Sequence, residues 1–592
     1  PGGPRVARGG ASRLGSATGR LAPDQRGAAL ARMAGEVFDV VVVGGGVTGV
    51  GCALDAATRG LTVALIEARD FASGTSSRSS KLVHGGLRYL EMLDVALVRE
   101  ALAERHLLLS RLAPHLVHPV PFLYPLRHRG WERAYVGSGL ALYDALGGAR
   151  SVPRHRHLSR HQALRVAPGL RRDALVGAVQ YHDAQTDDAR YVVAAARSAA
   201  HHGAVLARSV AATGFVDVGG TVAGVVATDL ENHQELVVRG RQVVNATGVW
   251  TDDTQQMGGA RGRFQVRASK GVHVVVPRDR ISLDTGLILR TETSVLFVIP
   301  WGRHWIIGTT DTDWNLDKAH PAASRTDVDY LLGHLNAVLR TPVGRSDVEG
   351  VYAGLRPLLG GESASTSNLS RRHAVSRPVP GLVVVAGGKF TTYRVMARDA
   401  IDAAAGGLPG AVPPSCTAEV PLLGADGYPA LRNHRLHLAA QSGLHVARID
   451  HLLGRYGSCL HELLDLIDAR PELAEPLPGG DEYLGAEVVH AVTHEGALHL
   501  EDVLARRTRL SFEAADRGLR AAEAVAGLMG AELGWDEATR ASELERYRLQ
   551  VHAEREAEAQ PDDRSADAAR LGAPDPYRPP PRLPTGPGRR TH

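Results

Sequence analysis

The sequence predicts an α/β protein in which a parallel sheet is joined to an antiparallel sheet and is followed by a helical region. An apolar run at residues 38 to 43, a helix at about 47 to 59 and a second strand at 61 to 67 form a strand–helix–strand unit, typical of a parallel sheet buried on both faces. Short alternating strands dominate between about residues 205 and 307. Beyond residue 410 the apolar pattern is helical through about residue 559, which predicts a separate helical domain.

Length and charge narrow the class of protein. The chain has 592 residues, more than a single hydrophobic core usually supports, so we expect two or three domains. Residues 1 to 32 carry six arginines and one aspartate, so this segment accounts for the net charge of +4 and leaves the rest of the chain near neutrality. Because the positive charge belongs to a terminal segment, we expect no nucleic-acid partner.

The three cysteines, Cys52, Cys416 and Cys459, are far apart and form neither a metal-binding nor a disulfide pattern. This usage is typical of a reducing compartment, so we expect a cytoplasmic protein without a metal site. No apolar run in the sequence reaches the roughly 18 residues needed to span a bilayer. Attachment to a membrane surface stays open.

A glycine motif lies between the first strand and its helix. Residues 44 to 49, Gly-Gly-Gly-Val-Thr-Gly, match the spacing G-x-G-x-x-G. Gly44 permits a tight turn, Gly46 lets a pyrophosphate approach the backbone, and Gly49 lets the helix pack closely on its strand. The helix N-terminus offers N–H groups to phosphates, and Glu67 is placed to accept from ribose hydroxyls. The unit predicts a bound dinucleotide; the acid disfavours NADP but does not separate NAD from FAD.

Two further strand-to-turn segments favour a flavin. Residues 245 to 248, Asn-Ala-Thr-Gly, follow an apolar strand, and residues 387 to 393 join the strand at 382 to 386 to a helix. A helix N-terminus at the pyrimidine end of an isoalloxazine ring would stabilise the negative charge of the reduced flavin. Each turn alone is an ordinary structural turn, but three such turns on buried strands predict a cradle for a long cofactor such as FAD.

Residues 74 to 91, Gly-Thr-Ser-Ser-Arg-Ser-Ser-Lys-Leu-Val-His-Gly-Gly-Leu-Arg-Tyr-Leu-Glu, resemble the signature of FAD-dependent glycerol-3-phosphate dehydrogenases of the aerobic, bacterial type. Further matches follow in family order at residues 270–273, 308–311, 354–357, 387–389, 494–495 and 501–508, the last two in the helical region. The resemblance covers about residues 36 to 550. It implies oxidation of sn-glycerol 3-phosphate to dihydroxyacetone phosphate by hydride transfer to FAD, with the electrons passed to a quinone.

The resemblance and the apolar patterns together predict a Rossmann-like FAD-binding domain with an antiparallel-sheet substrate domain and an all-helical C-terminal domain. We expect the first two to be interleaved within residues 36–405, with the substrate part at about 111–175 and 263–349, and the helical domain at 406–559. Residues 1–35 and 560–592 are expected to be a disordered leader and a disordered tail, because their Gly-, Arg- or Pro-rich composition shows no periodicity.

The cofactor is expected to lie against small residues, hydroxyls and backbone N–H groups of these segments. The expected FAD-binding residues are Gly44, Gly46, Gly49, Glu67, Thr75, Ser76, Ser77, Ser80, Lys81, Gly85, Gly86, Val210, Ala246, Thr247, Gly248, Gly388, Lys389 and Thr391. By resemblance, the substrate-binding residues are Arg88, Tyr89, Arg356 and Arg371, since guanidinium groups suit a phosphate dianion.

Hydride transfer from the carbinol carbon to flavin N5 needs a base for the hydroxyl proton, and the resemblance favours His273. Along the strand at 272 to 276 the valines share one face and His273 points to the other. An ordinary histidine pKa of about 6.5 suits a general base. A core histidine bonded to backbone is the structural alternative. Arg356 and Lys389 are expected to stabilise the developing alkoxide, whereas Lys270 and His84 are weaker candidates that could orient the flavin.

Three other functions stay open. The same motifs suit a glycerol-3-phosphate oxidase that reduces oxygen, and an amine-oxidising relative would keep the fold without needing phosphate-binding arginines. A flavin-binding regulator without activity is the third. Quinone use implies, through the family alone, peripheral contact with the inner face of the membrane. A homodimer is compatible with the helical domain.

Overall fold

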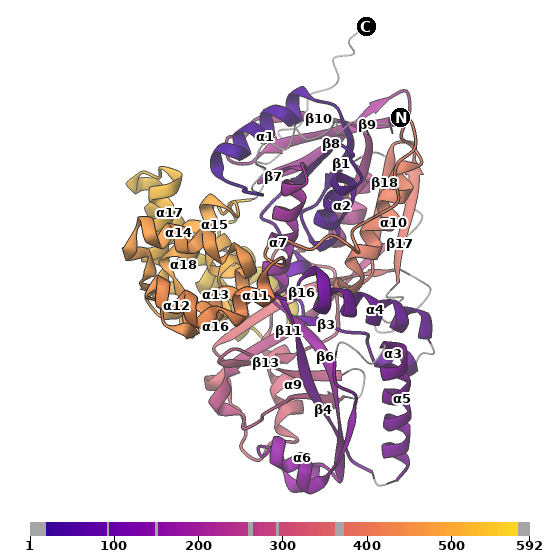
Figure 1. Cartoon of the computed structure of the whole chain (residues 1–592), viewed down its shortest axis with the longest axis vertical. Helices are drawn as coiled ribbons and strands as arrows, with labels where there is room; N and C mark the ends of the chain where they lie inside the picture. The colour runs from indigo at the N-terminus through magenta and orange to yellow at the C-terminus, as the bar shows by residue number, and fades with distance from the viewer. Residues whose placement is uncertain are drawn as a thin grey trace, which may run out of the picture.

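The structure, a computed structural model, describes residues 19 to 577 except 92–93, 129, 148–151, 258–264, 292–294 and 361–371. An eight-stranded sheet occupies the upper part of Figure 1 and a ten-stranded sheet the lower part, while the C-terminal helices, orange to yellow, lie to one side. No helix within the described residues is long and apolar enough to cross a bilayer.

β1 (Phe38–Val43) lies at the centre of the first sheet, whose order is β17-β18-β10-β1-β2-β7 with β9 and β8 attached beyond β10. It pairs in parallel with β2 (Val63–Glu67) and β10 (Glu235–Asn245). Residues 40 to 42 are completely buried, as a strand covered on both faces requires. The other strands are β7 (Val205–Arg208), β8 (Val210–Val218), β9 (Thr221–Asp229), β17 (His373–Val379) and β18 (Leu382–Gly387).

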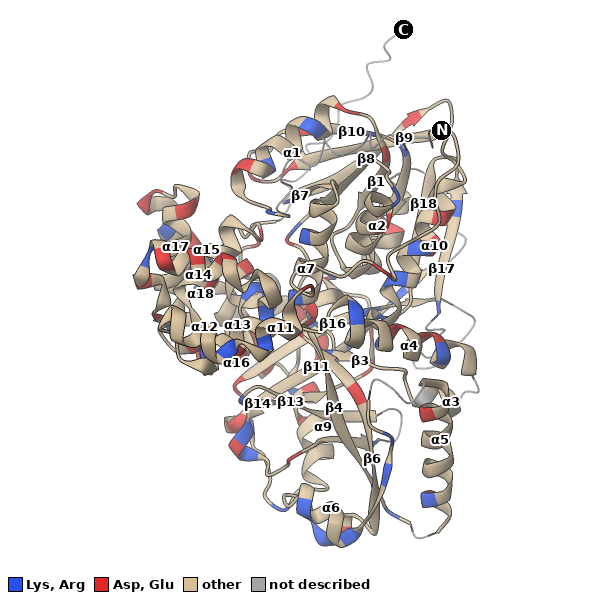
Figure 2. Cartoon of the chain, viewed as in Figure 1, with Lys and Arg blue, Asp and Glu red and all other residues tan. Residues whose placement is uncertain are grey.

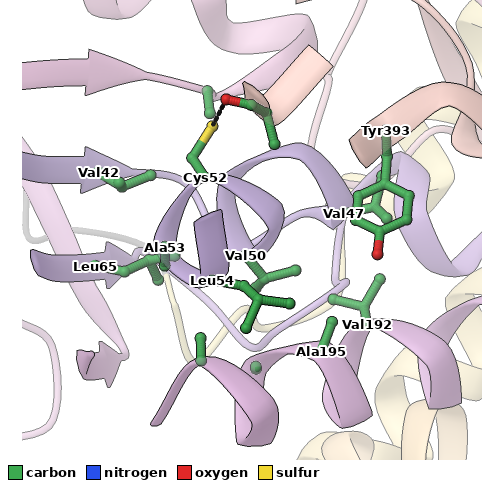
Figure 3. Close-up of a cluster of buried hydrophobic side chains, with 14 of the residues drawn as sticks. Val42, Val47, Val50, Cys52, Ala53, Leu54, Leu65, Val192, Ala195 and Tyr393 are labelled. Atoms are coloured by element: carbon green, nitrogen blue, oxygen red, sulfur yellow. Dashed lines mark hydrogen bonds between the residues drawn. The ribbon is translucent and has the colours of Figure 1, made fainter. Parts of the chain in front are cut away.

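Helices α2 (Val47–Thr58), α7 (Asp188–His201) and α10 (Tyr393–Ala405) cover one face of this sheet. Figure 3 shows Val50 and Leu54 of α2 directed toward Val192 and Ala195 of α7. Residues of α1 (Pro23–Gly35), β8 and β9 belong to the core on the opposite face. Because both faces are covered, we expect a ligand to bind at the carboxyl ends of the parallel strands.

The second sheet is mostly antiparallel and has the order β15-β11-β14-β13-β12-β4-β6-β3, with β16 beside β11 and β5 beside β6. Helices α6 (Arg160–Val166) and α9 (Arg325–Asn336) pack on one face. The strands are β3 (Leu82–Val83), β4 (Val117–Leu126), β5 (Arg156–Ser159), β6 (Gly177–Thr186), β11 (Val266–Pro277), β12 (Gly286–Arg290), β13 (Val295–Trp301), β14 (His304–Gly308), β15 (Thr312–Trp314) and β16 (Gly350–Leu359). Helices α3 (Arg88–Glu91) and α4 (Val95–Leu107) lie between β3 and β4, and α5 (Trp131–Gly147) lies between β4 and β5, all within this sheet. Helix α8 (Thr251–Gln256) lies between β10 of the first sheet and β11 of the second.

The second sheet recruits strands from outside the two segments expected to form the substrate part. β3, β6 and β16 lie beyond residues 111–175 and 263–349. β16 pairs with β11 along ten residue positions, and β6 pairs with β4 along another ten. Membership of a sheet depends on such pairing between distant segments, which apolar periodicity within one segment does not encode.

The C-terminal region is a helical domain with its own apolar cores. Its helices are α11 (Tyr428–Asn433), α12 (Arg435–Ser442), α13 (Val446–Tyr456), α14 (Leu460–Ala469), α15 (Gly485–Thr493), α16 (Leu510–Glu513), α17 (Leu519–Leu533) and α18 (Glu537–Ala559). A two-stranded ladder of β19 (Pro476–Leu477) and β20 (Gly480–Leu484) lies between α14 and α15. The domain is therefore mainly helical and not made of helices alone.

The expected disordered leader was wrong for residues 23 to 35, which form helix α1 (Pro23–Gly35). Met33 on this helix is completely buried against the first sheet, and Arg26 pairs with Asp229 at 2.5 Å. A Gly- and Arg-rich composition suggests disorder when the segment is considered by itself. Here the helix gains its stability from tertiary contacts with the rest of the protein. Residues 1 to 18 of the expected leader lie outside the described residues.

The expected disordered tail was likewise wrong for residues 560 to 577. Asp562 caps helix α19 (Asp563–Leu571), and the following segment ends on Tyr577, which is 2% exposed. Asp563 contacts Lys270 at 2.5 Å. These partners lie hundreds of residues away, so the Pro- and Asp-rich composition gave no sign of them. Residues 578 to 592 lie outside the described part of the chain.

Candidate active site

One cavity of about 1440 Å³ runs between the two sheets. It is larger than the cavities that hold single small ligands, which measure roughly 300–1,000 Å³. Its walls come from the carboxyl ends of β1 and β2, the loop at residues 73 to 90, the turn after β10, strands β11 and β16, and residues 387 to 391. The cavity therefore joins all three turns that the sequence singled out.

The glycine turn after β1 forms one end of this cavity. Gly44 has a φ of +111° and lies against the backbone of Ala246, where a Cβ would approach the Ala246 carbonyl oxygen to 2.7 Å. A Cβ on Gly49 would lie 1.8 Å from the Gly44 carbonyl oxygen. Gly46 is the N-cap of α2, so the first N–H groups of this helix open toward the cavity. The turn has the shape that a pyrophosphate requires.

Glu67, at the end of β2, lines the cavity but is already bonded to backbone. Its carboxylate accepts from the N–H of Gly45 at 2.5 Å and from the N–H of Arg69 at 2.8 Å. Burial raises the pKa of Glu67, against the effect of these two donors. The acid therefore holds the glycine turn in place, and a carboxylate can accept a further hydroxyl on its remaining lone pairs.

The loop at residues 74 to 91 divides into a cavity side and a core side. Thr75, Ser76 and Ser80 line the cavity, and the Ser76 hydroxyl accepts from the N–H of Val47 at 2.9 Å. By contrast, the described structure places Ser77, Lys81 and Gly85 outside the cavity lining. Gly85 instead packs against Leu102 and Tyr143, leaving no space for a side chain.

Lys81 is a correction to the expected cofactor set. Its ammonium is completely buried, pairs with Asp188 at 2.7 Å and donates to the Ser77 carbonyl at 2.5 Å. It also lies 4.9 Å from the ring centre of Tyr352. Burial lowers the pKa of Lys81 to about 8. The side chain therefore fixes the loop to α7, because Asp188 lies at the helix start, a partner that the loop sequence cannot show.

Arg356 reaches the cavity from β16. Its guanidinium donates to the Thr310 carbonyl at 3.2 Å and to the Thr309 hydroxyl at 3.0 Å, and it pairs with Asp311 at 3.2 Å. The antiparallel register places Arg356 opposite Ser269 of β11. The side chain is 22% exposed, so the charge is held in a fixed orientation while one part faces the cavity.

His273 faces the cavity, whereas the neighbouring valines of β11 face the core, as strand parity predicted. Its Nε2 lies 2.8 Å from the Ser80 hydroxyl, and its ring stacks on Tyr352 with centres 4.8 Å apart. Nδ1 has no hydrogen-bond partner among the described residues. Burial, followed by the charges of Arg356 and Lys81, holds the pKa of His273 well below 6.5, so the imidazole is neutral.

Lys389 and Tyr89 line the cavity together, with the ammonium 3.6 Å from the centre of the tyrosine ring. Nearby, the Thr391 hydroxyl accepts from the N–H of His84 at 3.1 Å, which joins the third turn to the loop. The weaker candidate Lys270 does not line the cavity and is held by Asp327 at 2.6 Å. The side chain of Arg88, and Arg371 entirely, lie outside the described residues.

Two groups of cavity residues were missed by the sequence analysis. The first comes from α5, where Tyr135, Val136 and Leu142 line the cavity. The second comes from the C-terminal segment, where Asp575 and Tyr577 line the end beside Glu67. The apolar residues between 131 and 147 were a readable signal of a helix with an apolar face, but nothing in the composition of the tail indicated a cavity wall.

Comparison with known proteins gives a family for the whole chain. The family model "FAD dependent oxidoreductase" matches residues 39–402, and the model "C-terminal domain of alpha-glycerophosphate oxidase" matches residues 415–540. Glycerol-3-phosphate dehydrogenase 2 of Mycobacterium tuberculosis is 59% identical over 94% of this chain and 95% of its own length. The chain belongs to the FAD-dependent glycerol-3-phosphate dehydrogenases.

More distant glycerol-3-phosphate dehydrogenases are also similar to this chain over most of its length. The mitochondrial enzyme of Homo sapiens is 37% identical over 86% of this chain and 72% of its own. The glycerol-3-phosphate dehydrogenase of Bacillus halodurans, solved in complex with FAD, has a TM-score of 0.75 at 30% identity, covering 90% of this chain and 97% of that one. The predicted family, fold class and cofactor are thereby confirmed.

The residues that line the cavity fit FAD. The glycine turn leaves room for a pyrophosphate, and small residues and hydroxyls of the loop at 73 to 80 and of the turn after β10 line the cavity beside it. The expected cofactor residues that line the cavity are Gly44, Gly46, Glu67, Thr75, Ser76, Ser80, Gly86, Val210, Ala246, Thr247, Gly248, Gly388, Lys389 and Thr391. Gly49 does not line the cavity, but it lets α2 pack closely on the glycine turn.

Proposed function

We propose that this protein oxidises sn-glycerol 3-phosphate to dihydroxyacetone phosphate, using FAD as the hydride acceptor. The observation that carries the proposal is the single cavity that joins the glycine turn to Arg356, His273 and Lys389. Cations on fixed elements suit a small phosphate monoester, and the neutral histidine beside them suits its secondary hydroxyl. The relatives named above act on a substrate of this name.

FAD, when bound, supplies a ring that accepts a hydride from the carbinol carbon. Arg356 and Lys389 bind the negative charge of the substrate and stabilise the alkoxide that develops on its hydroxyl. His273 takes the hydroxyl proton at a ring nitrogen. Ser80 and Tyr352 hold the imidazole in its plane, so the base does not reorganise during the reaction. Arg88 and Arg371, which the family resemblance adds, complete the proposed phosphate site.

The sharpest test of this function is anaerobic mixing of the purified yellow protein with glycerol 3-phosphate. We expect the flavin colour to bleach, with dihydroxyacetone phosphate formed in equal amount. Glycerol 2-phosphate is the matched control, because it carries the same phosphate without a secondary hydroxyl to oxidise. A flavin that stays oxidised with both would identify a flavin-binding regulator instead.

We further propose a quinone as electron acceptor and peripheral contact with the inner face of the membrane. The support comes from α5, which is largely uncharged in Figure 2 and exposes Trp131 by 65%, Tyr135 by 50% and Leu142 by 45%. Because Tyr135 and Leu142 also line the cavity, an apolar surface leads directly into it. Apolar patches of this kind suit lipid and lipid-soluble ligands.

Binding to vesicles tests the membrane proposal. We expect Leu142→Asp to weaken co-sedimentation with anionic lipid vesicles, while Leu436→Asp on α12, at a residue 66% exposed, leaves it unchanged. Equal vesicle binding by the two variants would show that α5 is not the surface that contacts the membrane. Light scattering on the same preparations reports whether the protein is a homodimer.

A glycerol-3-phosphate oxidase is the second candidate, and the carboxy-terminal family model, named after an oxidase, is the observation that favours it. Oxygen consumption with and without a soluble quinone analogue separates the two acceptors. Fast peroxide formation that the quinone analogue does not suppress would establish the oxidase. An amine oxidase is disfavoured because Arg356 and Lys389 match a phosphate better than an amine.

A further inference from the structure

We propose that residues 571 to 577, here called the C-terminal strap, close the adenosine end of the FAD cleft and slow the release of the cofactor. Asp575 is the positioning residue that holds the strap in place. The inference rests on FAD binding by this chain and concerns a segment that lies outside the residues matched by the two family models.

The strap is a wall of the cavity itself. After α18 the chain turns at Asp562, forms α19, and then passes along the cavity, where Leu571, Ala573, Asp575 and Tyr577 are lining residues. The same end of the cavity is lined by Glu67 and by residues 210 to 212 of β8. In a dinucleotide fold the acid at the end of the second strand marks the ribose of the adenosine half. The strap therefore lies beside adenosine, far from the reacting carbon.

Asp575 connects the strap to the strand that carries the ribose acid. Its two carboxylate oxygens accept from the guanidinium of Arg69 at 2.8 Å each, and one of them lies 2.9 Å from His320 Nε2. The backbone N–H of Arg69 in turn donates to Glu67. Although burial opposes ionisation, His320 and Arg69 hold the pKa of Asp575 well below its ordinary value. A bidentate, partly buried pair of this kind specifies one geometry.

Tyr577 fixes the end of the strap to two other elements. Its hydroxyl donates to Asp502 of the helical domain at 2.5 Å, and its ring lies edge-on to His499 with centres 4.9 Å apart. The ring also packs against Ala211 and Leu230 beside β8. The strap is thus attached to β2, to β8 and to the helical domain, so its opening breaks several buried contacts together.

Such an arrangement does more than stabilise the fold, because the attached segment bounds the cavity. A cofactor whose adenosine lies behind the strap can leave only after the Asp575 and Tyr577 contacts open. Coupling between two sites is reciprocal. If the strap retains the cofactor, the bound cofactor must stabilise the ordered strap by the same free energy. Loss of the strap is therefore expected to weaken FAD binding more than it weakens the apoprotein.

Two truncations test this directly. A chain ending at Gly572 lacks the Asp575 and Tyr577 anchors, whereas a chain ending at Tyr577 keeps the whole strap and is the matched control. Release of FAD from holoenzyme is followed by the rise in flavin fluorescence, and the dissociation constant is obtained by titrating apoprotein with FAD. We expect the shorter chain to release FAD at least about tenfold faster, and the control to match the full chain.

Point variants keep the test decisive if the shorter chain fails to fold. Asp575→Asn and Tyr577→Phe should each raise the rate of FAD release, while Glu556→Gln, at an exposed acid on α18, should not. The shift in Tm on adding FAD to apoprotein separates retention from general stability. This FAD-induced shift should be smaller in the strap variants than in the full chain. A merely structural role would lower the Tm of apoprotein and the Tm of holoenzyme equally and leave the shift unchanged.

The outcomes distinguish this proposal from the proposed function. If the full chain binds FAD but the strap variants release it at the rate of the full chain, the strap proposal is overturned and the dehydrogenase stands. If the full chain itself binds no FAD, the proposed dehydrogenase function is overturned, and the strap proposal, which rests on it, is overturned with it. Faster release with an unchanged rate of flavin reduction by glycerol 3-phosphate would support both.

Discussion

The guanidinium of Arg507 donates to both carboxylate oxygens of Asp70, 437 residues earlier in the chain, at 2.7 and 2.8 Å. Arg506 donates to the same carboxylate at 2.6 Å, and all three side chains are buried. Asp70 follows β2 near the cavity, whereas the two arginines belong to the helical domain. The family motif at residues 501 to 508 is therefore a connection between domains.

Removing the shared carboxylate should destabilise the protein. Asp70→Ala leaves two buried guanidinium groups without this partner, and we expect a loss of about 3–5 kcal/mol in the free energy of unfolding. Denaturant unfolding measures it. Asp313→Ala, which removes the exposed partner of Arg267, is the control and should cost no more than about 1 kcal/mol. Equal losses in the two variants would mean that the domains are held together by other contacts.

Gly49→Ala should abolish cofactor binding. The added Cβ would lie 1.8 Å from the Gly44 carbonyl oxygen, so either α2 or the glycine turn must move. We expect protein that purifies colourless and regains little flavin from added FAD. Gly333→Ala, on a helix position with open space around it, should keep the full flavin content. A yellow Gly49→Ala protein would show that the turn tolerates this displacement.

Arg356→Ala should lose activity while its flavin content stays unchanged. The guanidinium is fixed by Thr309, Thr310 and Asp311, so its charge is preorganised for an anion. We expect kcat to fall on the order of 10²–10³-fold, as for loss of one oxyanion donor. Arg303→Ala, at an arginine 75% exposed, is the control. An apoprotein would place Arg356 in cofactor binding instead.

His273→Ala should slow anaerobic flavin reduction by about 10²–10⁴-fold, the contribution of a general base. Because the pKa of His273 lies below 6.5, the imidazole is neutral and competent at higher pH. Activity should therefore fall only as the pH drops well below 6.5, and the variant should lose this acid limb. Stopped-flow absorbance over a pH series measures both. An unaltered rate, as expected for the surface variant His201→Ala, would rule out the base.

His499 predicts a pH dependence of stability. Burial opposes its protonation, but Glu231 and Glu543 overcome this and raise the pKa of His499 from 6.5 to about 10. A raised pKa stabilises the fold fully below about pH 6.5, and the contribution is lost as the pH rises toward about 10. Tm should decline over this range in the native chain and less steeply in His499→Gln. Parallel Tm curves would assign the decline to other groups.

Local patterns predicted much of the candidate site. The turn at residues 44 to 49, the parity of His273 on its strand and the turn before Thr391 could each be read from one contiguous segment. Lys81 could not, because the sequence gives its position in the loop but not the buried Asp188 that draws its side chain away from the cavity. A charged side chain takes the orientation that its partner dictates, and that partner is distant in sequence.

The sequence by itself determined the α/β class, the dinucleotide turn and the family, since these depend on spacing within short stretches. Only the tertiary structure decided that α1 is ordered, that Arg506 and Arg507 meet Asp70, and that Asp575 reaches Arg69 at the cavity. The physical reason is range: helix and turn preferences act over a few residues, whereas burial and ion pairing are fixed by whichever surfaces the folded chain brings together.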